Sequence, residues 1–76
     1  MQITLKAART NKGMTQMQVA EYLGVSYGSY QRFEANPGRV YLYRAKALAE
    51  LFGIKLEDIS LGDSYSHAET RAKKAL

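Results

Sequence analysis

The sequence contains no cysteine, no tryptophan, one proline and one histidine among its 76 residues. The absence of cysteine excludes disulfides, thiolate zinc sites and thiol catalysis. His67 has no second histidine or carboxylate pair at metal-ligand spacing, so we expect no metal site and no cofactor. The sequence also has no nucleophile–base pair and no phosphate-cradling glycine loop. We therefore expect a protein that is not an enzyme.

Long apolar segments are missing as well. No run approaches the roughly 20 residues that cross a bilayer, and no signal-peptide core opens the chain. We expect a cytoplasmic protein without a membrane partner. A chain of 76 residues provides one small domain, because a second core needs roughly 50 residues of its own. Eleven Lys and Arg against seven Asp and Glu give a net charge of +4, which mildly favours an anionic partner.

Capping residues and glycines divide the chain into short helices. Thr4, Thr15 and Ser26 are typical N-caps, and Gly13, Gly24 and Gly53 stand where helices end. The expected helices cover residues 5–12, 16–23, 27–34, about 41–52 and, as a short fifth element, about 56–59. Asn36-Pro37-Gly38 is a strong turn signal.

Apolar residues at helical spacing predict one core. Its expected members are Leu5, Ala7, Ala8, Met14, Met17, Val19, Ala20, Leu23, Val25, Tyr30, Phe33, Leu42, Ala45, Leu48, Ala49 and Phe52. We expect an all-α domain of four to five short helices over residues 1–62, followed by a polar, flexible tail over residues 63–76. Residues 2–4 and 58–61 alternate like short strands, but pairing between them is the less favoured interpretation.

The stretch from Thr15 to Glu34 predicts a helix-turn-helix. A three-residue turn containing glycine makes the two helices cross at a steep angle. Ala20 must be small because the second helix packs across it, and Gly24 must adopt a left-handed conformation. Val25 and Tyr30 then seat the second helix on the core.

This stretch resembles the helix-turn-helix of the Cro/CI-type (XRE family) repressors, and small regulators of Gram-positive phages and mobile elements look particularly similar. The resemblance covers about residues 3–62. It includes Leu5-Lys6-Ala7-Ala8-Arg9, Thr15-Gln16, Leu23-Gly24-Val25-Ser26, Glu34 and Leu48-Ala49-x-x-Phe52-Gly53-Ile54. It implies a lambda-repressor-like fold whose third helix enters the major groove of DNA.

The resemblance also implies roles for individual residues. The groove-facing, base-reading positions are Tyr27, Gly28, Gln31 and Arg32. The positions that contact phosphate are Thr15, Gln16, Ser26, Ser29, Arg39, Tyr41 and Arg44. Arg9 and Glu34 match a structural salt bridge between the first helix and the end of the third.

The chemistry of the third helix fits these roles independently. Arg32 can pair with guanine O6 and N7, and Gln31 can read adenine N6 and N7. Gly28 departs from the family, whose members often carry a polar side chain there. Either the backbone approaches the DNA closely at Gly28, or this position is not read. Tyr41 and Tyr43 could form a stacking platform for single strands, but half-buried tyrosines at a helix start are the favoured interpretation.

The function that follows is a sequence-specific regulator of transcription that binds double-stranded DNA, with repression by occupancy of a two-fold operator. We expect a homodimer, because one helix in one groove buries too little surface to select a genomic site. The expected dimer surface is formed by exposed apolar residues at Ile54, Leu56, Ile59 and Leu61.

The alternative is an antitoxin-like or anti-regulator module that binds a protein partner through its C-terminal segment. Arg71, Lys73 and Lys74 in that segment could grip DNA or seek a membrane surface, but a solvated terminus is the favoured interpretation.

Overall fold

Side-chain caps begin the first three helices of the computed structural model, which describes residues 2–61. Thr4 accepts a hydrogen bond from the Ala7 N–H, and Ser26 accepts one from the Ser29 N–H. Thr15 forms a complete capping box with Gln18: each side chain accepts the other's backbone N–H, at 3.1 and 2.8 Å. Three of the five expected helix starts are therefore fixed by local hydrogen bonds.

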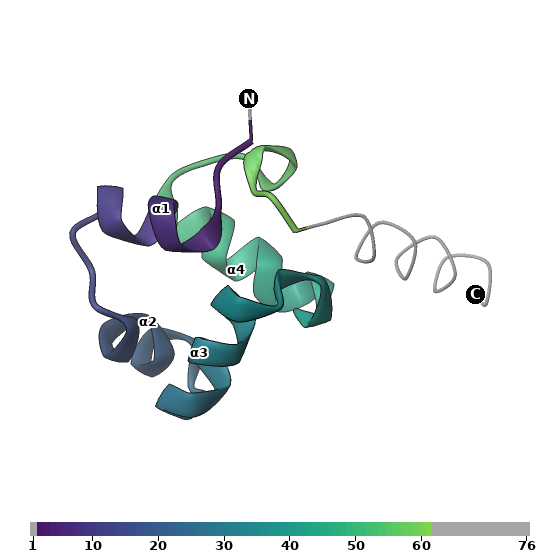
Figure 1. Ribbon diagram of the computed structural model, residues 1–76. Helices are drawn as coiled ribbons and strands as arrows, with labels where there is room; N and C mark the ends of the chain where they lie inside the picture. Colours follow the sequence, from purple (N-terminus) through teal and green to yellow (C-terminus); the bar gives the residue numbers. More distant parts are fainter. Residues whose placement is uncertain (1, 62–76) are drawn as a thin grey trace.

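The described part of the chain contains four helices and two 3₁₀ turns, and Figure 1 shows how the helices are arranged. They are α1 (Leu5–Asn11), α2 (Gln16–Leu23), α3 (Tyr27–Ala35), η1 (Pro37–Arg39), α4 (Leu42–Phe52) and η2 (Leu56–Asp58). The all-α prediction is confirmed. The boundaries differ by one residue at the end of α1, the end of α3 and the start of α4, where Tyr41 is the N-cap. The expected fifth helix is the 3₁₀ turn η2.

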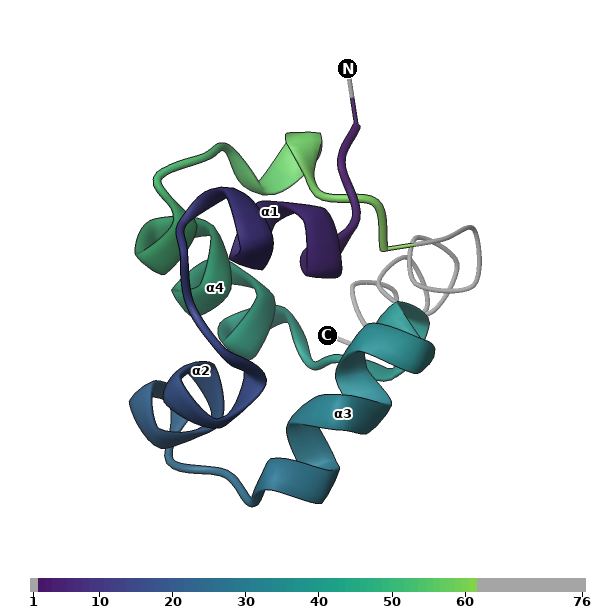
Figure 2. The same ribbon diagram turned by 60° about the vertical axis from the view of Figure 1, so that its left-hand side comes forward.

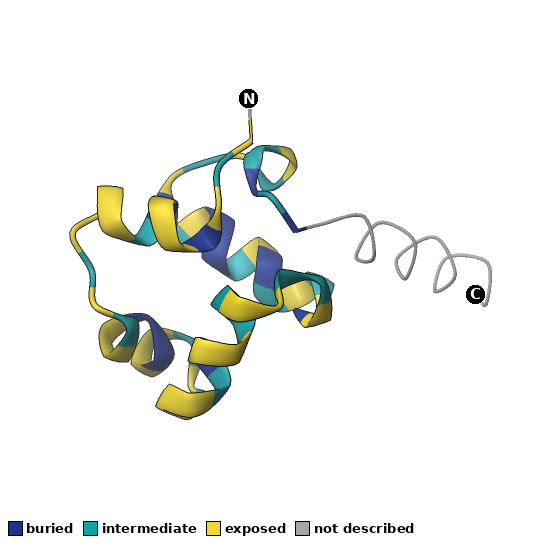
Figure 3. Ribbon diagram, in the orientation of Figure 1, coloured by how far each residue is buried: buried dark blue, intermediate teal, exposed yellow. Residues whose placement is uncertain are grey.

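One core lies between the four helices, and every helix contributes to it. Its buried side chains are Leu5, Ala8, Val19, Ala20, Tyr30, Val40, Ala45, Leu48, Ala49, Phe52, Ile59 and Leu61. Figure 3 shows that the buried parts of the helices lie on the sides that face one another. Two expectations were wrong: Met17 is 56% exposed and Ala7 is exposed, because both lie on the outward sides of their helices.

The N-terminal segment is tied to the end of the described chain. Ile3 and Ile59 form an isolated parallel bridge, in which the Ile3 N–H donates to the Asp58 carbonyl and the Ser60 N–H donates to the Ile3 carbonyl, both at 2.8 Å. The less favoured interpretation of these segments was thus the right one, although the pairing is a single bridge.

This bridge corrects the expected dimer surface. Ile59 and Leu61 are buried within the domain, at 2% and 8% exposure, because the bridge holds their segment against the core. Ile54 and Leu56 are half-buried and pack against the same core. Residues 63–76, with the expectations placed on the tail, His67, Arg71, Lys73 and Lys74, lie outside the described residues.

Candidate nucleic-acid interface

The turn between α2 and α3 fixes how α3 is presented. Gly24 ends α2 with φ of +72°, in the left-handed region that favours glycine. The Val25 N–H returns to the Ala20 carbonyl at 3.0 Å, and Ser26 then caps α3. The Tyr30 side chain, on the inner side of α3, is fully buried. Its ring lies edge to face with the Phe33 ring, and the two ring centroids are 6.1 Å apart. The opposite side of α3 therefore faces outward (Figure 2).

The outward side of α3 carries the four positions expected to read bases. Tyr27, Gly28, Gln31 and Arg32 are all exposed. Within residues 2–61, the Gln31 and Arg32 side chains form no hydrogen bond or ion pair. Two long hydrogen-bonding side chains are thus available to a partner on the same face of one helix.

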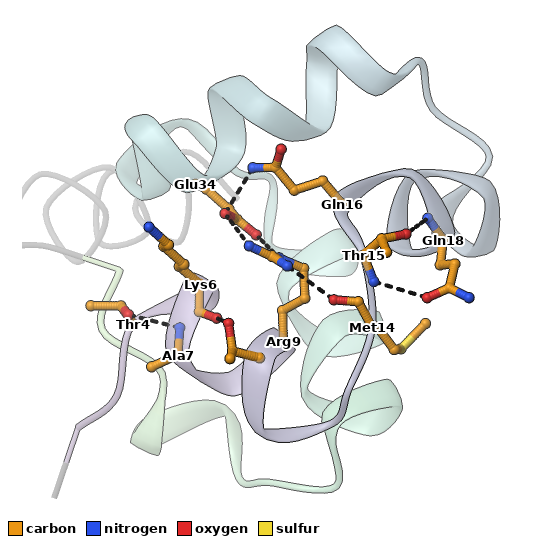
Figure 4. A network of polar contacts seen from close by, with 10 residues as sticks. Thr4, Lys6, Ala7, Arg9, Met14, Thr15, Gln16, Gln18 and Glu34 are labelled. Carbon is orange, nitrogen blue, oxygen red and sulfur yellow. Dashed lines mark hydrogen bonds and ion pairs between the residues drawn. The ribbon is translucent and has the colours of Figure 1, made fainter.

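The C-terminal end of α3 is held by a polar network that joins α1, α2 and α3 (Figure 4). Arg9 Nε and Glu34 Oε2 are 2.6 Å apart, and the Arg9 Nη1 donates to the Met14 carbonyl at 2.9 Å. Gln16 Nε2 donates to Glu34 Oε1 at 3.0 Å. One carboxylate on α3 therefore binds the first residue of α2 and a guanidinium on α1.

This network shifts the pKa of its charged members. The hydrogen bond to Glu34 raises the pKa of Arg9. Burial by itself would raise the pKa of Glu34, but the hydrogen bond from Arg9, the neighbouring Tyr30 hydroxyl and the hydrogen bond from Gln16 outweigh it and hold that pKa below its usual value. Burial, together with the nearby Glu34 charge, raises the pKa of Tyr30. Arg9 and Glu34 are therefore both charged at neutral pH, and the ion pair between them is maintained.

The network includes one residue that was not expected in it. Gln16, which is predicted to contact phosphate, donates its amide nitrogen to Glu34 in this structure. Sequence patterns did not indicate this bond, because Gln16 and Glu34 are 18 residues apart and on different helices. The only local signal was the position of Gln16 directly after the N-cap Thr15, which places its side chain near the start of α2.

Serine hydroxyls and cationic side chains lie along one edge of α3. The Ser26 Oγ donates to the Ser29 Oγ at 2.9 Å, in addition to its cap bond. Beside Ser29 is an open depression of about 320 Å³, lined by Ser29, Arg32, Phe33, Asn36 and Arg39. Two arginine residues therefore line one depression. Phe33 and Asn36 were not among the expected site residues, although they follow Ser29 at helical spacing.

Tyr41, Tyr43 and Arg44 form a stack at the start of α4. The two tyrosine rings are 6.1 Å apart with an interplanar angle of 14°, and the Arg44 guanidinium lies 5.0 Å from the Tyr43 ring centroid. Arg44 also donates to the Leu23 carbonyl at 3.3 Å, at the end of α2. The expectation of half-buried tyrosines was wrong: Tyr41 is 71% and Tyr43 is 63% exposed, since each stacks on the other and not on the core.

Across residues 2–61, no group of three or more metal-ligating side chains is present. None of the helices described is long and apolar enough to cross a membrane.

The fold and the outward face of α3 define a DNA-binding helix-turn-helix domain of the regulatory class. A family model described as "Helix-turn-helix" matches residues 5–59, which covers all four helices. The chain belongs to this family, the XRE family of Cro/CI-type helix-turn-helix proteins. Its members are generally not enzymes. Searches of curated proteins and of solved structures found no significant match.

Proposed function

We propose that the chain represses transcription by binding a two-fold operator as a homodimer, with one α3 in the major groove of each half-site. The observation that carries this proposal is the outward face of α3, on which Gln31 and Arg32 are exposed and free of partners among the described residues. Their helix is held at both ends: by Gly24 and Ser26 at its start, and by Glu34 at its end. Such preorganisation suits recognition of a fixed surface.

The proposed base contacts follow from the side-chain chemistry of α3. Arg32 donates to guanine O6 and N7, and Gln31 pairs with adenine N6 and N7. Tyr27, which is 45% exposed, contacts a phosphate through its hydroxyl or a thymine methyl through its ring. Gly28 has no side chain to read a base, so it contributes through the space that it leaves.

Phosphate contacts surround this face and set the register of the helix. Arg39 and Ser29 border the depression beside α3, where the Arg39 guanidinium and the Ser29 hydroxyl can meet a DNA phosphate. Thr15, Gln16 and Ser26 lie at the starts of α2 and α3, where helix dipoles favour anions. Tyr41 offers an exposed hydroxyl, and Arg44 a guanidinium shared with Tyr43 and Leu23.

The homodimer is proposed for energetic reasons. A single small module gives a limited interface, whereas two half-sites one helical turn apart multiply the selectivity of each. Occupancy of such a site excludes other proteins from the same DNA, which is sufficient for repression.

Selection from random duplex DNA tests this function directly. Wild type is compared with Gln31→Ala, Arg32→Ala and the charge-matched control Lys55→Ala, since Lys55 precedes η2, which Figure 2 places away from the outward side of α3. We expect an inverted repeat from wild type and Lys55→Ala. Each α3 variant should relax the preference at defined positions and lose about 1–3 kcal/mol of binding free energy.

Two results would contradict the proposal. One is the absence of any selected motif with wild type. The other is a motif that survives both α3 substitutions unchanged. Salt titration separates the antitoxin-like alternative, because DNA binding weakens steeply with ionic strength while binding of a protein through apolar surface hardly responds.

A further inference from the structure

Gly28 is the second residue of α3, on its outward face, and the folded domain gives no reason for a glycine there. The glycines with positive φ are Gly13, Gly24 and Gly53, so Gly28 needs no left-handed backbone. A Cβ built on Gly28 would meet no atom within 4 Å, among the residues that the structure describes. Glycine in a helix is nevertheless less stable than alanine, through its greater loss of backbone freedom.

We infer that Gly28 is a specificity-determining position, at which the backbone of α3 packs directly against base edges in the major groove. This inference rests on the proposed function. Gln31 and Arg32 are three and four residues further along α3, so all three positions lie on one face of the helix. A docking that brings the two long side chains to the bases brings the Gly28 Cα to the floor of the groove. The open space around Gly28 in the free protein is then filled by DNA.

This arrangement gives Gly28→Ala opposite effects on folding and on binding. The methyl group removes the conformational disadvantage of glycine and meets no protein atom, so the fold gains stability. In the complex the same methyl group occupies space that belongs to a base edge, and the tightly packed interface resists it. Substitution of a residue that matters only for folding would change the stability of the fold and the affinity for DNA in the same direction.

The experiment measures melting temperature and affinity for the duplex that wild type selects, in wild type and Gly28→Ala. We expect the melting temperature to rise by a few degrees and the affinity to fall by about tenfold or more. A second selection with Gly28→Ala should return a changed preference at one or two adjacent base pairs. The preference at positions read by Arg32 should be retained.

Ala7→Gly is the matched control, because Ala7 is an exposed residue inside α1. This alanine-to-glycine substitution should lower the melting temperature and leave the affinity of the folded protein for the selected duplex unchanged. Its behaviour separates the general effect of glycine in a helix from an effect of DNA contact.

Two outcomes overturn the inference. Equal affinity of wild type and Gly28→Ala would show that no close contact exists at this position. A loss of affinity that is uniform across sequences, with an unchanged selected motif, would assign the contact to the DNA backbone and not to bases. Failure of wild type to select any sequence is a separate result, which removes the proposed function and this inference with it.

Discussion

At the scale of single residues, Glu34 is the group on which most of the polar structure depends. Its carboxylate receives hydrogen bonds from Arg9 on α1 and Gln16 on α2, and it is itself part of α3. If one partner is removed, the charged and polar groups that remain in this half-buried cluster lose their hydrogen bonds. The resulting loss in the free energy of unfolding exceeds the net contribution of the pair. One side chain of α3 therefore links this helix to both α1 and α2, in addition to the turn at Gly24 and the packing of Tyr30 in the core.

Glu34→Gln should lower the free energy of unfolding by about 2–3 kcal/mol at pH 7, because Arg9 loses its counter-charge. The pKa of Glu34 is lowered by folding, so the ionised carboxylate stabilises the fold above its usual pKa and that contribution disappears as the pH falls through the folded pKa. The stability gap between wild type and Glu34→Gln is accordingly full at pH 6–7 and narrows below about pH 4.

Urea unfolding of both proteins at pH 7 and pH 3 measures this difference. Glu50→Gln is the control, because Glu50 is an exposed residue of α4 without an ion pair among residues 2–61. It should follow wild type at both pH values. A gap between wild type and Glu34→Gln that stays constant with pH would mean that the carboxylate charge is not what stabilises the network.

Tyr30 carries a second residue-scale prediction. Its side chain is fully buried, and its hydroxyl has no hydrogen-bond partner among the described residues. Tyr30→Phe should therefore change the free energy of unfolding by less than about 1 kcal/mol, whereas Tyr30→Ala should cost about 3–5 kcal/mol through the cavity it leaves. Chemical denaturation of the two variants distinguishes the hydroxyl from the ring. A loss near 2 kcal/mol or more in Tyr30→Phe would contradict an unpaired hydroxyl.

At the scale of elements, the turn between α2 and α3 depends on backbone conformation more than on space. A Cβ on Gly24 would meet nothing within 4 Å, but its φ of +72° is unfavourable for most residues. Gly24→Ala should cost about 1–2 kcal/mol, and Gly24→Asn should cost less because asparagine tolerates this region better. Thermal unfolding followed by circular dichroism compares the two. Equal losses in both variants would point to a steric cause.

The same elements explain how far the sequence could predict the structure. Helix starts were accurate where a side chain caps the helix, as at Thr15 and Ser26, because capping is decided within three or four residues. Contacts between distant segments were less accessible. The bond from Gln16 to Glu34 and the burial of Ile59 depend on how helices and termini pack, and no local pattern encodes that packing.

The candidate site shows the same division. The exposure of Gln31 and Arg32 followed from the periodicity of α3, whose other side carries Tyr30. The exposure of Tyr41 and Tyr43 did not, since aromatic residues near a helix start can pack inward or stack on each other with equal sequence signals. The stack depends on tertiary structure, in which Arg44 lies over the Tyr43 ring and also donates to the Leu23 carbonyl at the end of α2.

At the scale of the whole molecule, the domain presents one α3, so in the proposed homodimer selectivity depends on how the two copies are arranged. A two-fold dimer holds its two α3 helices about 34 Å apart, one turn of DNA, and both half-sites must face the same side of the duplex. Binding should therefore depend on the rotation between half-sites as well as on their sequence. The burial of Ile59 and Leu61 inside each domain means that these two side chains do not supply the contact between copies.

A series of duplexes tests this arrangement with the protein unchanged. Insertion of five base pairs between the half-sites turns one of them to the opposite side of the DNA, since a full turn takes about 10 base pairs. We expect affinity for that duplex to fall to the level of an isolated half-site. Analytical ultracentrifugation should count two chains on the intact site. Equal affinity for both spacings would mean that each copy binds alone, and the specificity of the protein would then have to come from a single α3.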